Sequence, residues 1–413
     1  MMIKNIYHHF GSGSTPESSE IKYYENGTIN WLNTADLKND LVVETSRKIT
    51  SLALKEKSLR IYPINTLAIA MYGQGDTRGN VGLLKIEATT NQAACMMYCS
   101  SNSIPEYMLL WFVAKKTDIR ELNVGATQPN MNKDFVRNLL MSLPPLPEQK
   151  SIAHYLDTKT AQIDRKIDLL TQKAKSYADL KRSLINETVT RGRDRSVPMK
   201  DSAIEWIGEV PEHWEVKRVK EFSVIVNGST PKSTVLENWD GNHNWVTTDD
   251  LGKLTTKFVT ESKRKITDIG LRSCGTSLCP KGSVVLSGRA PIGHIGIFSI
   301  EACTNQGCKT LVFDQKIANN TFVFYGLFVS KEKLQALGRG TTFIELSTKE
   351  LSLFRLSLPP LSEQKAIATY LDTKTAQIDQ IIQTINTQIE KLKELRKTLI
   401  NDVVTGKIKV TED

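Results

Sequence analysis

The feature that most constrains this chain is an internal repeat, in which one segment returns almost unchanged 215 residues later. The segment LPPLPEQKSIAHYLDTKTAQID at 143–164 returns as LPPLSEQKAIATYLDTKTAQID at 358–379, with 19 of 22 positions identical. The similarity continues at the same offset, without an insertion, over the whole of 143–190. Such self-similarity predicts two copies of one structural unit rather than a single large fold.

Shorter matches precede each copy. Gly13-Ser14-Thr15-Pro16 matches Gly228-Ser229-Thr230-Pro231, Trp31 matches Trp245, and Thr90-Asn91-Gln92 matches Thr304-Asn305-Gln306. The apolar runs between these matches are short and interrupted by turn residues, which predicts mixed strands and small helices. We therefore expect the following order: a first module at 1–142, a first long helix at 143–192, a linker and second module at 193–357, and a second long helix and tail at 358–413.

Both long segments keep a heptad pattern after a Pro-Pro stop. In the second copy Leu371, Ile378, Ile385, Leu392 and Leu399 recur every seven residues, and the first copy repeats the pattern. Sustained heptads favour a coiled coil, although each helix could instead lie on its own domain. We expect an α+β fold in which two mixed α/β domains are separated by two long helices, paired as an antiparallel coiled coil with internal pseudo-two-fold symmetry.

Charge and composition limit the function classes. The chain has 54 Lys and Arg against 45 Asp and Glu, and a net charge of +9 is compatible with a polyanionic partner. We found neither an apolar run that predicts a membrane helix nor a signal peptide, so we expect a cytoplasmic protein without a membrane partner. Cys274 with Cys279, and Cys303 with Cys308, have spacing that zinc ligands can show, but core packing is the better interpretation.

The LPPLxEQ element that opens each helix and the entry segment Trp206–Trp214 resemble the type I restriction-modification specificity subunits. The resemblance covers essentially the whole chain, except that the first module has no counterpart of the entry segment. It implies two target recognition domains that read the two halves of an interrupted double-stranded DNA sequence, and helices that set the spacing and dock two modification subunits. Restriction subunits would join through the complex. S-adenosylmethionine, ATP and magnesium would belong to the partners, so this chain would carry no cofactor, metal site or catalytic residues.

Two other function classes would make different demands on the sequence. A metal-dependent nuclease acting alone would need a site such as Asp250 with Glu261 and Lys263, where carboxylates hold Mg²⁺. Asp250 is better explained by its partner Asp36 in a repeated turn. A coiled-coil assembly protein without a DNA role would show no salt-dependent binding to duplex DNA.

Residues that can reach base edges or phosphates should lie on loops carried by a firm scaffold. Arg78 and Arg289 are candidates for guanine, and Gln74 and Gln128 for adenine. The full set of predicted DNA contacts is Ser14, Thr15, Lys22, Asn33, Thr34, Lys38, Gln74, Arg78, Thr127, Gln128, Ser229, Thr230, Lys232, Thr247, Thr248, Arg289, His294, Thr341 and Thr342. The predicted contacts with partner subunits are Glu148, Gln149, Glu363 and Gln364.

Overall fold

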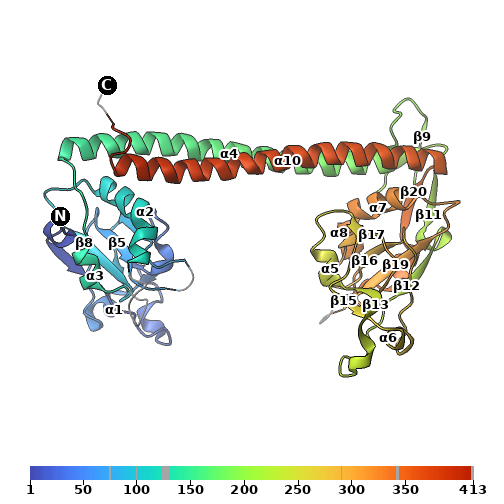
Figure 1. Cartoon of the computed structure of the whole chain (residues 1–413), viewed down its shortest axis with the longest axis horizontal. Helices are drawn as coiled ribbons and strands as arrows, with labels where there is room; N and C mark the ends of the chain where they lie inside the picture. The colour runs from blue at the N-terminus through green and yellow to red at the C-terminus, as the bar shows by residue number, and fades with distance from the viewer. Residues whose placement is uncertain (74–75, 99, 123–130, 290, 341–343, 411–413) are drawn as a thin grey trace. The chain divides into compact units, whose positions relative to one another are not determined.

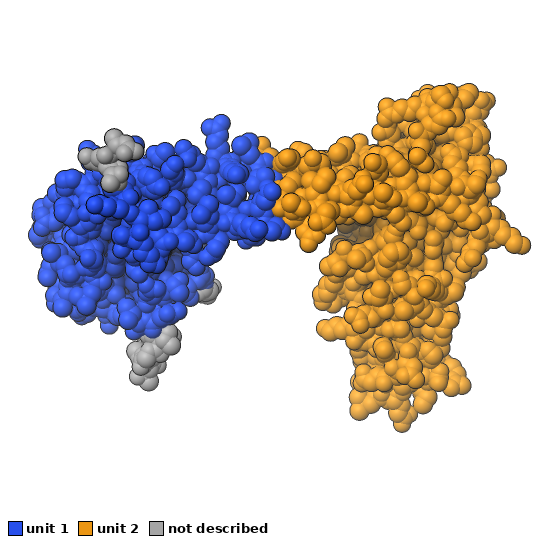
Figure 2. Space-filling view, turned by 45° about the horizontal axis from the view of Figure 1, so that its top comes forward, with its two compact units in different colours: residues 1–171, 386–413 blue, residues 172–385 orange. Residues whose placement is uncertain are grey.

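The computed structural model describes residues 1–73, 76–98, 100–122, 131–289, 291–340 and 344–410. Two compact units are present, one made of 1–171 with 386–413 and the other of 172–385 (Figure 2). We call them unit 1 and unit 2. Each contains one module and one end of both long helices. Among the described residues, no helix combines the length and apolarity that crossing a membrane requires.

Each module is built on a five-stranded sheet, and the two sheets have the same topology. The strand orders are β1-β8-β5-β6-β3 in unit 1 and β12-β19-β16-β17-β14 in unit 2. The last pair in each order is parallel and the others are antiparallel. The strands are β1 His9–Gly11, β3 Asp40–Val42, β5 Leu67–Ala70, β6 Val81–Leu84, β8 Ala94–Tyr98, β12 Ser223–Asn227, β14 Phe258–Val259, β16 Val284–Ser287, β17 Ile295–Phe298 and β19 Cys308–Phe313.

A smaller three-stranded sheet accompanies each large one. Its order is β4-β2-β7 in unit 1 and β15-β13-β18 in unit 2, with one antiparallel and one parallel pair in both. Within unit 2, β13 and β15 lie at the end of the module away from α10 (Figure 1). The strands are β2 Ile29–Leu32, β4 Arg47–Ile49, β7 Thr89–Thr90, β13 Trp239–Val246, β15 Arg264–Ile266 and β18 Ala302–Thr304.

Helices cover the face of each large sheet that is turned toward the long helices. In unit 1 this is α2, whose Tyr107 and Phe112 are fully buried; in unit 2 it is α7, with Phe322 and Val323 in the core. Asn side chains cap two of these helices at their N-termini, Asn132 for α3 and Asn319 for α7. The module helices are α1 Ser51–Glu56, α2 Pro105–Glu121, α3 Lys133–Asn138, α5 Thr248–Gly252, α6 Asp268–Arg272, α7 Asn320–Val329, α8 Lys331–Ala336 and α9 Thr348–Leu353.

The two long helices are α4, Leu146–Arg191, and α10, Leu361–Val404. In unit 1 the start of α4 and the end of α10 share one core, with Leu156 and Val403 both fully buried. In unit 2 the end of α4 and the start of α10 do the same. The predicted packing of the two helices on each other is therefore confirmed, and each helix also packs on a module at both of its ends.

Ion pairs show the direction of the pairing. Arg396 Nε lies 2.9 Å from an Asp164 carboxylate oxygen in unit 1, and Lys181 Nζ lies 2.6 Å from an Asp379 carboxylate oxygen in unit 2. Both pairs have residue numbers that add up to 560, which is the relation of an antiparallel pair. The repeat offset converts Asp164 into Asp379 and Lys181 into Arg396, so the two bridges are related by the internal symmetry.

The entry segment of module 2 forms a small hairpin of β9, Met199–Asp201, and β10, Glu209–Pro211. Trp214 follows it, is fully buried, and meets Phe322 edge-on at 6.3 Å between ring centroids. Trp206 stacks on Phe354 at 5.3 Å. The segment thus fastens the end of α4 to the module that follows it, in which strand β11, Glu215–Arg218, pairs with β20, Arg355–Leu358.

Candidate nucleic-acid interface

The first predicted DNA-contacting loop passes so close to a neighbouring strand end that only glycine fits. A Cβ atom on Gly13 would lie 1.6 Å from the Thr90 carbonyl oxygen, and one on Gly228 would lie 2.0 Å from that of Asn305. Ser14 N donates to Thr90 O at 3.1 Å and fixes the approach. The Gly-Ser-Thr-Pro matches in the sequence therefore mark one conformation, used in both modules.

A buried tryptophan in each module donates a hydrogen bond to the backbone of the same loop. Trp31 Nε1 donates to the Ser14 carbonyl at 3.2 Å, and Trp245 Nε1 donates to the Ser229 carbonyl at 2.9 Å. Both indoles are about one-twentieth exposed. A buried indole N–H needs an acceptor, and the loop backbone supplies it. Ser14 and Ser229 themselves are half-buried.

A second aromatic side chain holds the next part of each loop. Tyr24 donates its hydroxyl to the Pro16 carbonyl, and Trp239 Nε1 donates to the Lys232 carbonyl at 3.3 Å. Each of these rings meets the buried tryptophan of its module edge-on. The residue type differs between modules, but the arrangement of two aromatic donors under one loop is the same.

The threonine of each loop is paired with a glutamine. Thr15 Oγ1 donates to Gln92 Oε1 at 2.8 Å, and Thr230 Oγ1 donates to Gln306 Oε1. Both glutamines are exposed. A glutamine amide can pair with adenine through two hydrogen bonds. Gln92 and Gln306 therefore join the predicted Ser and Thr residues as candidates, and the repeated Thr-Asn-Gln motif was the signal that pointed to them.

The second predicted loop is a capping box in both modules. Asp36 Oδ2 accepts from Asn33 N at 2.9 Å, and Asp250 Oδ2 accepts from Thr247 N at 2.8 Å. The other Asp250 oxygen accepts from Lys263 N at 3.3 Å. Both oxygens of Asp250 thus bind backbone donors, which explains this residue structurally and argues against the role as Mg²⁺ ligand that the nuclease alternative gave it.

The third predicted loop is fastened to a helix by different residues in the two modules. Lys116 Nζ of α2 lies 2.7 Å from Asp76 Oδ2, and Arg120 also bonds this carboxylate. The ammonium of Lys116 and the guanidinium of Arg120 hold the pKa of Asp76 below its usual value. In module 2 the bond is neutral, because Gln335 Nε2 of α8 donates to Ile292 O at 3.0 Å.

Arg289, the predicted guanine contact of module 2, is held by a carboxylate. Its Nε donates to Glu345 Oε2 at 3.0 Å, while Lys309 Nζ lies 3.5 Å from the other oxygen. The Arg289 side chain remains 45% exposed, whereas that of Lys309 is only 8% exposed. Guanine O6 and N7 can pair with the terminal NH₂ groups of an arginine, so a carboxylate at Nε orients the guanidinium. Cys95 takes the place of Lys309 in module 1.

The remaining predicted contacts fall into three groups. Lys22, Lys38, Thr34, Thr248 and Arg78 lie on or beside the expected turns. His294 instead lines a groove with Tyr325 and Lys331. Partial burial is the larger cause of its lowered pKa, and the positive charge of Lys331 is the smaller one. The residues Gln74, Thr127, Gln128, Thr341 and Thr342 lie outside the described part of the chain.

Two of the four predicted partner contacts have their side chains inside the protein. Gln149 and Gln364 are both fully buried. Gln149 Oε1 accepts from Ile104 N at 2.8 Å, and its Nε2 donates to Asn102 O and Pro144 O. Gln364 makes the corresponding three bonds in unit 2. These glutamines tie the start of each long helix to its module and serve the fold.

The two predicted glutamates have different surroundings. Glu148 is exposed at the start of α4. Glu363, its repeat in α10, accepts a hydrogen bond from His213 Nε2 at 2.9 Å. His213 belongs to the entry segment, which is why Glu148 has no corresponding partner among the described residues.

Three of the four cysteines of module 2 are buried, and Cys274 is half-buried. Cys279 and Cys308 lie in one apolar cluster and Cys303 in another. Burial raises the pKa of Cys279 to about 11 and that of Cys303 to about 12. Zinc binds thiolates, so these environments favour core packing, as expected from the sequence.

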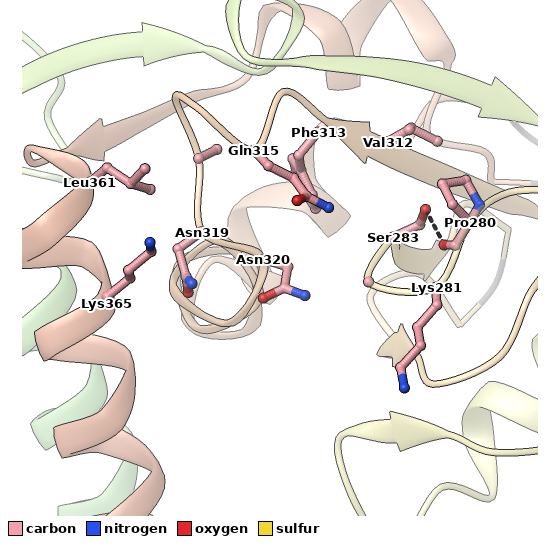
Figure 3. Close-up of a pocket in the computed structure, with 12 residues that line it drawn as sticks. Pro280, Lys281, Ser283, Val312, Phe313, Gln315, Asn319, Asn320, Leu361 and Lys365 are labelled. Atoms are coloured by element: carbon pink, nitrogen blue, oxygen red, sulfur yellow. Dashed lines mark hydrogen bonds between the residues drawn. The ribbon is translucent and has the colours of Figure 1, made fainter.

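One cavity of about 240 Å³ lies between the turn at Pro280–Ser283, the start of α7 and the start of α10 (Figure 3). Ser283 Oγ donates to Pro280 O across its wall at 2.7 Å. Its titratable lining residues are Lys281 and Lys365, without a carboxylate, histidine or thiol beside them. Such a lining has no acid–base pair for catalysis, and the cavity is a gap between the module and the helix.

A repeated strand is the site feature that the sequence reasoning missed. The tetrapeptide Arg-Lys-Ile-Thr occurs at 47–50 and again at 264–267. Its offset is 217 (264 minus 47), whereas the long helices repeat at 215, so a comparison at one fixed offset passes over it. It forms β4 and β15, each paired with the strand that carries the buried tryptophan.

Comparison with known proteins points to one family. The family model described as the type I restriction modification DNA specificity domain matches residues 2–175 and 211–391. The chain belongs to this family. It is a type I specificity subunit, the DNA-recognition component of a restriction-modification system, and not a catalytic one.

Relatives of this specificity subunit occur in Methanocaldococcus jannaschii and Escherichia coli. The MjaIX specificity subunit of Methanocaldococcus jannaschii is 31% identical over 48% of this chain and 45% of the relative. The MjaVIII subunit of the same organism is 27% identical over 74% of this chain and 70% of the relative. A solved structure described as the basis of complex assembly and conformational transition of the type I R-M system covers 99% of this chain and 97% of its own, at a TM-score of 0.76 and 17% identity. The last likeness concerns the fold.

Proposed function

We propose that this specificity subunit reads an interrupted double-stranded DNA sequence, one half with each module. The observation that carries the proposal is the pair of loop clusters: the same backbone framework presents different side chains in the two units. The glycine contact, the buried tryptophan and the threonine–glutamine pair are common to both modules. The third loop offers Asp76 in one and Arg289 in the other. Two different half-sites, and therefore an asymmetric target, follow from this difference.

Methylation-sensitive sequencing of host DNA, with and without this gene, tests the proposal. The expected result is a bipartite methylated-adenine motif that appears only with the gene. Exchanging residues 215–345 for another module should change one half of the motif. A change in both halves would contradict independent reading, and the absence of any gene-dependent motif would contradict the proposed function as a whole.

We propose also that the paired helices dock two modification subunits, which would supply S-adenosylmethionine chemistry, while restriction subunits would supply ATP- and magnesium-dependent steps in a cytoplasmic complex. Exposed side chains support this. Lys159 and Gln162 of α4 recur as Lys374 and Gln377 of α10, and all four are exposed. Packing of the helices explains identity at buried positions but not at these. Two copies of one partner explain it.

The surface beside these residues is also repeated. A groove of about 540 Å³ in unit 1 and one of about 590 Å³ in unit 2 lie between the module and both long helices. Asp157 and Thr160 line the first, and Asp372 and Thr375 line the second. Matching hollows next to matching exposed side chains are suited to one kind of protein partner bound twice.

A stoichiometry experiment tests the docking surface. Lys159→Glu and Lys374→Glu should each remove one modification subunit, and the double variant should remove both, as measured by native mass spectrometry of the co-expressed complex. Arg165→Glu is the matched control, because Arg165 is exposed on α4 but is Gln380 in the repeat. Two subunits still bound to the double variant would contradict the proposed surface.

We propose finally that the helix length sets the gap between half-sites. Removing Leu170–Ser176 and Ile385–Lys391 takes one heptad from each helix and leaves both interhelical ion pairs in place. The pair becomes shorter by about 10 Å, or about three base pairs. The variant should select a shorter gap, or lose binding if the half-sites turn away from the modules. An unchanged gap with full affinity would show that the helices do not set the spacing.

A further inference from the structure

Each module carries two exposed basic residues on the missed strand. Arg47 and Lys48 lie on β4, at one edge of the small sheet of unit 1, and Arg264 and Lys265 lie on β15, at the same edge in unit 2. All four side chains are exposed, whereas the isoleucine that follows each pair is fully buried. The isoleucine anchors the strand and the basic residues face solvent.

The arginine of each pair lies beside the aromatic side chains that hold the first loop. Arg264 pairs with Trp245 across the strands, and its guanidinium carbon lies 3.6 Å from the ring centroid of Trp239. Arg47 is opposite Trp31 in the same register. Burial raises the pKa of Tyr24, and the positive charge of Arg47 opposes that rise, so Arg47 is also close to the second aromatic donor.

When a guanidinium stacks on an aromatic face, its N–H groups point outward in the guanidinium plane, parallel to the ring. They can therefore still bind a ligand. The stacking also restricts a side chain that would otherwise lose much rotamer entropy on binding. Because Trp239 bonds the Lys232 carbonyl, Arg264 is fixed relative to the first loop. The guanidinium is thus prepared for a ligand bound beside that loop.

The charge of these residues has no partner carboxylate in the part of the chain that the structure describes. Across the described residues, none of Arg47, Lys48, Arg264 and Lys265 forms an ion pair. Arg289 of module 2 differs, since it is paired with Glu345. Two unpaired cations, placed at one edge of the sheet in each module, attract an anionic ligand.

We propose that Arg47 and Arg264 bind DNA backbone phosphates and position the first loop of each module against the bases. This inference rests on the proposed function and adds a class of contact to it. The two modules are expected to read different half-sites, so a residue that is identical in both cannot account for the difference. Phosphate is the DNA group that is the same at every site, and phosphate contacts fix register without specifying sequence.

Salt dependence separates a phosphate contact from a base contact. The slope of log affinity against log salt is negative, and Arg47→Gln and Arg264→Gln in the full-length chain should each make it shallower by about 0.9, and the double variant by about 1.8. Each single change should weaken binding about tenfold at low salt. The loss should be equal for the methylation-mapped target, for targets with one base pair changed in either half-site, and for a random-sequence duplex, measured by fluorescence anisotropy.

Three further variants make the result decisive. Arg47→Lys and Arg264→Lys should retain the salt slope, because lysine also binds phosphate as a point charge. Arg355 is exposed on β20, which lies near the long helices in unit 2 (Figure 1). Arg355→Gln should therefore leave both the DNA affinity and the salt slope unchanged. Unchanged melting curves would show that the variants are folded.

A relaxed preference at one base pair with an unchanged slope would overturn the inference, because the arginine would then read a base. An unchanged affinity for every duplex would overturn it as well, because the arginine would then only cover the aromatic pair. The random-sequence duplex keeps this result separate from the proposed function: a reduced slope there supports the phosphate contact even where no bipartite motif is found.

Discussion

The five-stranded and three-stranded sheets have the same topology in units 1 and 2, yet the units differ in how the module is fastened to the long helices. Both units use a fully buried glutamine, Gln149 or Gln364, at the start of a long helix. Unit 2 adds the entry segment, which buries Trp214 and bonds Glu363 through His213. The glutamine contact is therefore the fastening that both units share, and the entry segment is an addition in unit 2.

The largest loss of stability should come from a substitution in the entry segment of unit 2. Trp214→Ala removes a fully buried indole and should destabilise unit 2 by about 4 kcal/mol, whereas unit 1 contains no counterpart among its described residues. Hydrogen exchange resolved by peptide would measure the loss of protection in each unit. Trp206→Ala, at a partly buried position, is the control and should cost less. Equal loss in both units would show that they do not unfold separately.

Removing the buried glutamine should destabilise both units by the same amount. Gln149→Ala leaves one backbone N–H and two backbone carbonyls without their side-chain partner, as Gln364→Ala does in unit 2. We expect about 3 kcal/mol of destabilisation for each. Urea unfolding of the two single variants measures it. A much smaller effect of Gln149→Ala would mean that the first module is held mainly by other contacts.

Substitutions at Gly13 and Gly228, where the first loop of each module approaches a neighbouring backbone, should destabilise the protein less but should affect one half-site each. Gly13→Ala and Gly228→Ala each place a methyl group against backbone that cannot move away as a side chain would. We expect about 2 kcal/mol per substitution, and loss of recognition in one half-site only, a different half for each variant. Binding to duplexes with a single intact half-site is the measurement. Retained recognition of both halves would show that the loop is not part of the reading surface.

The smallest effect concerns the interhelical ion pairs. Double-mutant cycles on Asp164 with Arg396, and on Asp379 with Lys181, should give coupling energies of about 0.5 kcal/mol each, because all four side chains are partly exposed. The two values should agree, since the internal symmetry relates the pairs. Raising the salt concentration should reduce both. Unequal values would show that the two halves of the helix pair are held differently.

The sequence predicted the architecture well because near-identical heptads and a Pro-Pro stop leave few alternatives for the long helices. It predicted the module loops less completely, for two physical reasons. Insertions change the offset from 215 at Gly228 to 217 at Arg264, so equivalent strands lose alignment. Equivalent positions also use different residue types, since Trp239 donates the hydrogen bond to the first loop that Tyr24 donates in the other module. The burial of Gln149 could not be predicted, because two of its three partners, Ile104 N and Asn102 O, lie on a loop 45 and 47 residues away.

The division of both long helices between the units has a consequence for how the chain folds during synthesis. Unit 2 is continuous, from 172 to 385, so all of its contacts are available once that stretch has left the ribosome. Unit 1 closes only when 386–413 arrives, because Ile400 and Val403 complete a core begun at Ile3. The first module is therefore translated first and finished last. Until then it exposes apolar surface to chaperones and proteases, and a chain interrupted shortly after Ile385 should contain a folded second module beside an unfinished first one.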